Sequence, residues 1–239
     1  MAFDEKYFST NSYKDVSFAK YSQYWWSNRF FAILVRRYGE RGTRMLEIGS
    51  GLGHLVGQLD ENFTTVAVDI NHWALVQSKT IAPRTAQQVA SAEYLPFPDG
   101  SFGVIVIKHV VEHLPHPEKC IAELGRVMAP GGTLILATPN LASISRPWKG
   151  EKWIGYADKT HISLKQPFEW LGMIKGAGFQ VKRVFSDGLW DAPYIPVVPK
   201  PLQKLIFGSL GGLQAISGVV FVPMRWGESF LLVARKNNQ

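Results

Sequence analysis

A glycine-rich turn after an apolar segment constrains this 239-residue chain more than any other feature. Residues 44–49 read as a buried strand that runs into the turn Glu47-Ile-Gly-Ser-Gly-Leu-Gly53. Glycine lets a backbone turn this sharply and approach a ligand closely at low energetic cost. The N–H groups that follow such a turn can meet a carboxylate or another anionic group. The turn therefore predicts a ligand-binding loop directly after the first strand.

An acidic residue closes the next predicted strand. Residues 64–69 form a second apolar, β-branched segment, and Asp69 lies 22 residues beyond Glu47. A carboxylate at this place can accept two hydrogen bonds from a ribose diol. The loop departs from the G-x-G-x-x-G pattern of dinucleotide enzymes, because the sixth position counted from Gly49 is His54. It reads E-x-G-x-G-x-G instead.

Predicted strands and single helices alternate along most of the chain. Helices are predicted over residues 21–38, 54–60, 72–79, 117–128 and 167–175. Further strands are predicted over residues 85–89, 102–107, 133–138, 179–185 and 229–234. This alternation is typical of an α/β fold with a mostly parallel sheet and helices on both faces.

Composition indicates an intracellular globular protein. Apolar residues make up 46% of the chain and charged residues 19%, which excludes a disordered chain. The single cysteine, Cys120, excludes an intrachain disulfide and fits a reducing compartment. Residues 1–6 are acidic and polar, whereas a signal peptide begins with basic residues and continues with apolar ones. We therefore expect a cytoplasmic protein.

The net charge of +7 favours acidic partners, such as nucleic acid, anionic lipid head groups or phosphorylated substrates. The basic residues are scattered, however, and no basic run exceeds Arg36-Arg37. A solvated basic surface explains this pattern at least as well as a nucleic-acid-binding face. We therefore expect no nucleic-acid partner, and no feature predicts the oligomeric state.

Three segments together resemble the class I methyltransferases that use S-adenosylmethionine (SAM). The turn E-x-G-x-G-x-G resembles their first motif, and residues 91–114 (SAEYLPFPDGSFGVIVIKHVVEHL) and 126–139 (RVMAPGGTLILATP) resemble the middle of the family in order and spacing. The resemblance covers residues 40–186 and the final strand, and it is nearest to enzymes that methylate quinones and other small molecules. It implies a Rossmann-like, doubly wound, mostly parallel sheet with an antiparallel last strand.

The resemblance also implies SAM as cofactor, S-adenosyl-L-homocysteine as product, and the residues that bind them. The implied residues are Glu47, Gly49, Ser50, Gly51 and Gly53 around the methionine half, Asp69 at the ribose, Ile70, Ala92 and Glu93 around the adenine, and the backbone of Lys108 closing the methionine pocket. Relatives often carry Asp where this chain has Ser91, so the contact to the adenine amino group falls to Glu93 or to a backbone carbonyl.

Two histidines are candidate catalytic residues. Methyl transfer from a sulfonium needs mainly positioning and exclusion of water, and a general base only when the acceptor loses a proton, as a hydroxyl does. His113 follows the fourth strand, and a structural role in bonding the backbone explains it better than a catalytic role. His161 follows the fifth strand, where the family shows an Asp-x-x-His pattern facing the substrate, and Asp158 is expected to orient it.

The run His109-Val-Val-Glu-His113 has the spacing of an inverted zinc-peptidase signature. That chemistry needs both histidines on one face of a sustained helix, together with a distant third ligand. Here a strand runs directly into the motif, and Pro115 and Pro117 break any helix within a turn. We therefore predict no metal site.

Residues 188–227 join the last two strands, where relatives carry a short hairpin. The 20 residues from 205 to 224 are uncharged, but a single membrane crossing would separate two strands of one sheet. The simpler interpretation is a lid over the active site. The alternative is peripheral membrane contact through residues 200–226, flanked by Lys200, Lys204 and Arg225, on the inner membrane face.

We therefore expect a single methyltransferase domain with an aromatic helical cap (1–40), a SAM-binding core (41–187), the insertion (188–227) and a last strand (228–239). The expected activity is methyl transfer to a small-molecule or lipid-like acceptor, with oxygen as the acceptor atom. RNA or protein methylation is an alternative, although residues 107–110 (IKHV) stand where amino-methylating enzymes carry N-P-P-Y. A non-catalytic SAM-binding protein is the third hypothesis.

Overall fold

A computed structural model of the chain describes residues 16–238. Its centre is one seven-stranded sheet with the strand order β3-β2-β1-β4-β5-β7-β6. The strands are β1 (Arg44–Ile48), β2 (Thr64–Asp69), β3 (Ala86–Val89), β4 (Phe102–Lys108), β5 (Met128–Pro139), β6 (Phe179–Ser186) and β7 (Ser229–Lys236). Strand β7 is antiparallel to both of its neighbours, and all other pairs are parallel. The predicted fold, including its antiparallel last strand, is confirmed.

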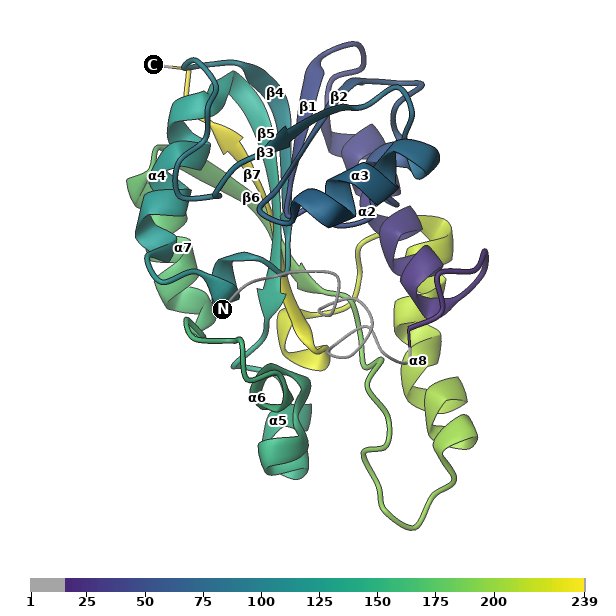
Figure 1. Cartoon of the computed structure of the whole chain (residues 1–239). Coiled ribbons are helices and arrows are strands. Elements are labelled where there is room, and N and C mark those ends of the chain that lie inside the picture. Colours follow the sequence, from purple (N-terminus) through teal and green to yellow (C-terminus); the bar gives the residue numbers. More distant parts are fainter. Residues whose placement is uncertain (1–15, 239) are drawn as a thin grey trace.

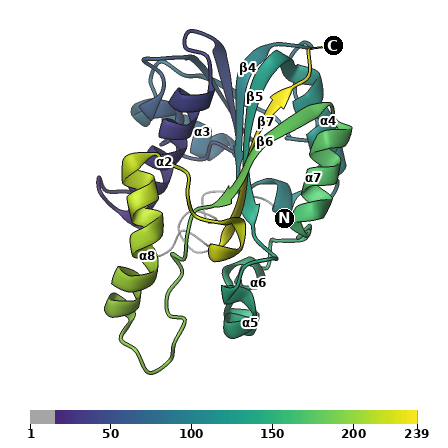
Figure 2. The ribbon, with the colours of Figure 1, turned by 180° about the vertical axis from the view of Figure 1, so that it is seen from behind.

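Helices cover both faces of this sheet (Figures 1 and 2). Helices α4 (Pro117–Val127) and α7 (Pro167–Gly176) lie on one face, and α2 (Gln23–Tyr38) and α3 (His72–Ile81) lie on the other. The remaining elements are α5 (Ser145–Lys149), α6 (Ile154–Ala157), α8 (Lys200–Ser217) and the 3-10 turns η1 (Val56–Gln58), η2 (Val111–His113), η3 (Gly150–Lys152) and η4 (Met224–Trp226).

Local sequence signals begin several helices. Helix α2 starts after Ser22, whose hydroxyl accepts a hydrogen bond from the N–H of Trp25 at 3.1 Å. Helix α7 starts with proline at its first position, and the side chains of Gln166 and Glu169 form a capping box there. Both devices satisfy N–H groups that have no partner inside the helix.

Successive side chains of each strand point to opposite faces of the sheet, which divides the core into two halves and determines where Glu47 and Lys108 lie. Leu46 and Ile48 pack against α4 and α7, whereas Met45 packs against α2 and α3. Because successive side chains of a strand point to opposite faces, Glu47 lies on the face of Met45. The same alternation places Lys108, at the end of β4, on the α2 face. These two side chains therefore meet at the carboxyl edge of the sheet.

The segment after the glycine turn differs from its prediction. The helix predicted over residues 54–60 is wrong, because only the short 3-10 turn η1 forms there. The N–H of Val56 donates to the Glu47 carboxylate at 3.1 Å. Gly57 packs so closely on α3 that an added Cβ would lie 2.7 Å from the carbonyl oxygen of Ile81. The segment after the turn is therefore held by its contacts with the Glu47 side chain and with α3.

The insertion of residues 188–227 forms α8, which lies beside α2 in both views (Figures 1 and 2). The Arg37 guanidinium donates to the carbonyl of Gly218 at 3.0 Å. The segment before α8 is anchored by Glu228, whose carboxylate accepts hydrogen bonds from the Tyr194 hydroxyl and the Trp153 indole, both at 2.7 Å. The first 15 residues of the predicted aromatic cap lie outside the described residues.

Candidate active site

A cavity of about 1030 Å³ lies at the carboxyl edge of the sheet. Its walls come from the glycine turn, the ends of β4 and β5, the segment after α6, and the facing sides of α2 and α8. Ligands of open α/β folds bind at this edge, and the volume is at the upper end for small-molecule sites. A hollow of about 620 Å³ between α4 and α7 gathers none of the predicted site residues.

The glycine turn has a conformation that requires its glycines. Gly49, Gly51 and Gly53 have φ angles of 69°, 51° and 78°, in the left-handed region that favours glycine. A Cβ added to Gly49 would lie 2.2 Å from Cγ2 of Val110. The backbone of Gly49 therefore packs closely against the segment after β4, so the fold requires this glycine independently of any ligand. Ser50, between these glycines, lines the cavity, and its buried hydroxyl has no hydrogen-bond partner within residues 16–238.

Asp69 accepts hydrogen bonds from the glycine turn and from the residue before α3. Its carboxylate accepts from the N–H of Gly51 at 2.7 Å and from the N–H of Asn71 at 2.8 Å. Burial raises the pKa of Asp69, and these backbone hydrogen bonds oppose that shift. Because each carboxylate oxygen has two lone pairs, both oxygens can still accept a hydroxyl donor.

Glu47 and Lys108 bring opposite charges to the floor of the cavity. Burial raises the pKa of Glu47, and the nearby Lys108 ammonium opposes this shift. Burial lowers the pKa of Lys108, and the negative charges of Glu47 and Asp187 oppose this shift. The Lys108 ammonium donates to the side-chain oxygen of Asn28 on α2 at 2.8 Å. Helix α2 is thereby linked to the carboxyl edge of the sheet.

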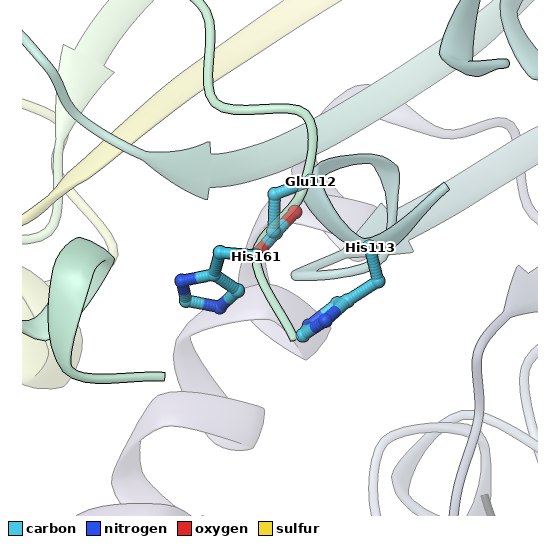
Figure 3. A group of neighbouring side chains, drawn as sticks. All are labelled: Glu112, His113 and His161. Atoms are coloured by element: carbon cyan, nitrogen blue, oxygen red, sulfur yellow. The ribbon is translucent and has the colours of Figure 1, made fainter. Parts of the chain in front are cut away.

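The two candidate catalytic histidines lie close together (Figure 3), and both line the cavity. The ring centroids of His113 and His161 are 4.7 Å apart. Nδ1 of His161 lies 2.8 Å from the carbonyl oxygen of Gly155, and Nε2 lies 3.9 Å from Oδ2 of Asp158. Nδ1 of His113 lies 2.8 Å from the Thr160 hydroxyl. Residues 48 positions apart in the sequence, from η2 and from the segment after α6, thus share one site.

The zinc-peptidase spacing does not produce zinc-peptidase geometry. The turn η2 is only three residues long, so His109 and His113 are not one turn apart on a sustained helix. His109 has a φ angle of 53°, which is uncommon for a residue with a side chain. Its Nδ1 lies 3.2 Å from the fully buried Glu112 carboxylate, and its Nε2 lies 3.4 Å from the Ser229 hydroxyl.

Comparison with known proteins decides the family. A family model described as a methyltransferase domain matches residues 23–184.

The chain belongs to this methyltransferase family.

Two curated relatives and one solved structure illustrate the similarity. The malonyl-[acyl-carrier protein] O-methyltransferase of Geobacter sulfurreducens is 27% identical over 192 residues, 75% of this chain and 71% of that protein. The ubiquinone/menaquinone biosynthesis C-methyltransferase of Yersinia enterocolitica is 31% identical over 121 residues, 45% of this chain and 48% of that protein. A SAM-dependent methyltransferase from Archaeoglobus fulgidus has the same fold, with a TM-score of 0.59, 21% identity, and coverage of 87% of this chain and 94% of that one.

The methyl donor of this methyltransferase is SAM. The residues present fit that cofactor, because the buried Ser50 hydroxyl has no partner among the described residues and Asp69 keeps lone pairs for a diol. Within the predicted SAM site, Glu47, Gly49, Ser50, Gly51 and Lys108 line the cavity. The other five residues do not line the cavity. Gly53 packs on α3, and Asp69 accepts a hydrogen bond from Gly51. Ile70 is exposed, Ala92 is buried, and Glu93 accepts a hydrogen bond from the N–H of His116 at 2.7 Å.

We predict that the Asp69→Ala variant of the methyltransferase binds SAM about 1.5–3 kcal/mol more weakly than the wild type. This is the usual cost of losing hydrogen bonds to a charged group. Isothermal titration calorimetry with SAM measures the effect, and circular dichroism checks that the variant is folded. Unchanged SAM affinity in a folded Asp69→Ala protein would show that Asp69 does not hold the ribose.

Sequence reasoning missed several groups that line the same cavity. Asn28 binds the Lys108 ammonium, and Asp187 accepts a hydrogen bond from the Ser229 hydroxyl at 2.7 Å. Burial raises the pKa of Asp187, and the bond from Ser229 opposes the shift. None of these residues belongs to a motif. The packing of α2 on the sheet brings Asn28 to the site, and the pairing of β6 with β7 brings Asp187 there.

Proposed function

We propose that this methyltransferase methylates a hydroxyl oxygen of a small, lipid-like acceptor. The observation that carries the proposal is one continuous cavity that joins the glycine turn to a pair of histidines and is walled by α2 and α8. When bound, SAM supplies an electrophilic methyl group. The chain's own residues then hold the acceptor, take up its proton and exclude water.

His161 is the proposed proton acceptor. Its Nδ1 lies against the Gly155 carbonyl, which can only accept a hydrogen bond, so Nδ1 carries the ring proton and Nε2 is the basic atom. Asp158 lies 3.9 Å from that Nε2 and would stabilise the charged ring once it has taken a proton. This arrangement supports oxygen as the acceptor atom, because a hydroxyl has a proton to lose.

His113 is proposed to hold the acceptor hydroxyl beside His161. Burial lowers the pKa of His113, an effect that the Glu112 carboxylate opposes. The Thr160 hydroxyl fixes its ring at 2.8 Å and in turn donates to Asp158 at 2.6 Å. A neutral, fixed imidazole suits orientation of the acceptor better than it suits proton uptake.

The acceptor atom can be tested on the product itself. Hot hydriodic acid cleaves an O-methyl ether or ester and releases volatile methyl iodide, whereas it leaves a carbon-bound methyl group in place. We expect the label transferred from methyl-labelled SAM to become volatile. Label that stays with the product would contradict oxygen and favour carbon, the atom named for the Yersinia relative.

A lipid-like acceptor is supported by the unusual polarity of α8. The face of α8 buried against the protein carries polar or small residues, among them Gln203, Gly211 and Gln214. Gln214 bonds the backbone of Ser186, Phe221 and Val222. The face turned to solvent carries the large apolar residues instead: Leu202, Leu205, Ile206, Leu210, Leu213 and Ile216. Surface helices normally have the opposite arrangement, so this stripe fits a nonpolar environment.

The charge around the stripe fits an anionic lipid surface. Lys200 and Lys204 lie at the start of α8, and no Asp or Glu occurs between Asp191 and Glu228. The cavity is lined by the same two lysines and by Gly211 and Ala215, so α8 separates it from the apolar stripe. We therefore infer that the insertion of residues 188–227 is both lid and membrane contact, for a cytoplasmic enzyme at the inner membrane face. Of the described helices, none has the length and apolarity to span a membrane.

We predict that the wild type co-sediments with vesicles containing an anionic phospholipid, and that Leu205→Glu/Leu213→Glu lowers the partition coefficient at least about 10-fold. The two side chains are 71% and 58% exposed, and burying each in lipid is worth roughly 1.5–3 kcal/mol. The control is Val76→Glu, an exposed apolar residue on α3 that should not change binding. Equal, weak binding of all three proteins would leave α8 only the role of a lid.

A further inference from the structure

Three side chains with metal-ligating atoms lie close together beside the cavity. Glu112, His113 and His161 each offer one ligand atom, and these atoms lie within 4.8 Å of one another. Figure 3 shows that Glu112 and His113 come from η2, whereas His161 comes from the segment after α6. His113 and His161 line the cavity, and Glu112 is fully buried behind them.

Outer partners hold the ligand side chains in place, and each Glu112 oxygen keeps a lone pair for a cation. Oε2 of Glu112 accepts a hydrogen bond from the Thr138 hydroxyl at 3.1 Å, and Oε1 lies 3.2 Å from the ring of His109. Nδ1 of His161 lies against the Gly155 carbonyl, which leaves Nε2 as its ligand atom. Metal ligands in proteins are held in this way by outer partners, which fix the ring orientation and the tautomer.

We propose that Glu112, His113 and His161 bind a divalent transition-metal cation, of which Zn²⁺ is the first to test, with an open coordination position toward the acceptor. Two imidazoles and one carboxylate suit zinc and its neighbours better than Mg²⁺ or Ca²⁺, which prefer oxygen ligands. Three protein ligands with an open position are typical of catalytic sites. The sequence predicted no metal, because its only metal-like spacing pairs His113 with His109.

The inference rests on the proposed function and extends it. A cation between the histidines would bind the acceptor oxygen and lower the pKa of its hydroxyl, whose proton would leave to solvent water. The oxygen then forms its bond to the methyl carbon, the carbon–sulfur bond breaks, and its electron pair stays on sulfur. In the metal-loaded protein, His161 is a ligand and the cation replaces it in activating the hydroxyl.

Metal binding is tested on the full chain after treatment with a chelator. Zn²⁺ is titrated directly, and Co²⁺ is added as a probe whose visible absorption reports nitrogen and oxygen ligands. We expect one cation per chain. Thr138→Val, which removes one outer partner of Glu112 and none of the ligands, should weaken Zn²⁺ binding about 10–100-fold, and His161→Ala should weaken it further. His116→Ala is the control, because its exposed ring contacts Glu118 and none of the three ligands.

Two results would overturn the metal site. One is no Zn²⁺ or Co²⁺ binding by the folded wild type, and the other is binding that His161→Ala and Thr138→Val leave unchanged. Circular dichroism of each variant separates loss of binding from loss of fold. Full methyl transfer by chelator-treated, metal-free protein would also overturn it, and the proposed function would then stand with His161 as base. Metal binding without any methyl transfer to a hydroxyl would instead overturn the proposed function.

Discussion

The His161→Ala variant should lose about 10²–10⁴-fold in kcat, the usual contribution of a positioned proton acceptor, while its SAM affinity stays unchanged. The reason is that His161 is the cavity-lining ring whose orientation is fixed by the Gly155 carbonyl and which lies near Asp158. The turn predicted to bind SAM, residues 47–53, comes from a different part of the chain, so the substitution leaves it intact. Steady-state rates at saturating SAM, with SAM affinity measured by calorimetry, separate the two effects.

Imidazole added to the assay discriminates between the two roles of this ring. Partial recovery of His161→Ala activity by imidazole, with a smaller loss in His113→Ala, fits a base at His161. Equal losses in His113→Ala and His161→Ala, without recovery, fit a shared metal site. His116→Ala is the matched control and should retain the wild-type rate. Unchanged turnover in a folded His161→Ala protein would show that His161 has neither role.

Replacing Gly49 by alanine should lower the free energy of unfolding by about 2–5 kcal/mol. Two costs add up at this position. A residue with a Cβ at a φ angle of 69° is strained by about 1–2 kcal/mol, and the added Cβ would lie 2.2 Å from Cγ2 of Val110, which overpacks the site by roughly 1–3 kcal/mol. The SAM affinity should fall as well, because relieving the clash displaces the turn. Urea unfolding and calorimetry measure the two effects.

Gly42 provides the control for this experiment. Its φ angle is 80°, similar to that of Gly49, but an added Cβ would meet nothing within 4 Å. Gly42→Ala should therefore show only the strain, about 1–2 kcal/mol, with unchanged SAM affinity. The double variant Gly49→Ala/Val110→Ala should recover part of the packing cost. If Gly49→Ala and Gly42→Ala destabilise the protein equally, the contact with Val110 does not constrain the turn.

The sequence predicted the sheet well because its signals are local. Strands β1, β2, β4 and β5 are mainly apolar and are buried along most of their length, as expected where both faces of a parallel sheet are covered. The glycine turn was predictable because the left-handed backbone is a property of residue type. The length of the helix expected after the turn was not predictable, because this segment packs on α3 at Gly57, a contact that is distant in the sequence, and only η1 forms there.

The site was predicted less completely because it depends on contacts that are distant in the sequence. His113 and His161 were identified singly, but their meeting depends on how the segment after α6 returns to η2. Glu112 was visible in the sequence next to His113, and only the structure shows that it shares a metal-ligand cluster with both histidines. The reversed polarity of α8 was also hidden, because Gln203 and Gln214 look like solvent-facing residues until their backbone hydrogen bonds are seen.

The most direct test of the whole account is methyl transfer from methyl-labelled SAM by the full chain into an extract of the cells that make the protein. The extract contains small molecules and lipids, and the products are partitioned between organic solvent and water. We expect label in the organic phase, released as methyl iodide by hydriodic acid and absent with the His161→Ala variant. Label confined to water-soluble products, or to protein or RNA in an unfractionated lysate, would contradict the lipid-like acceptor.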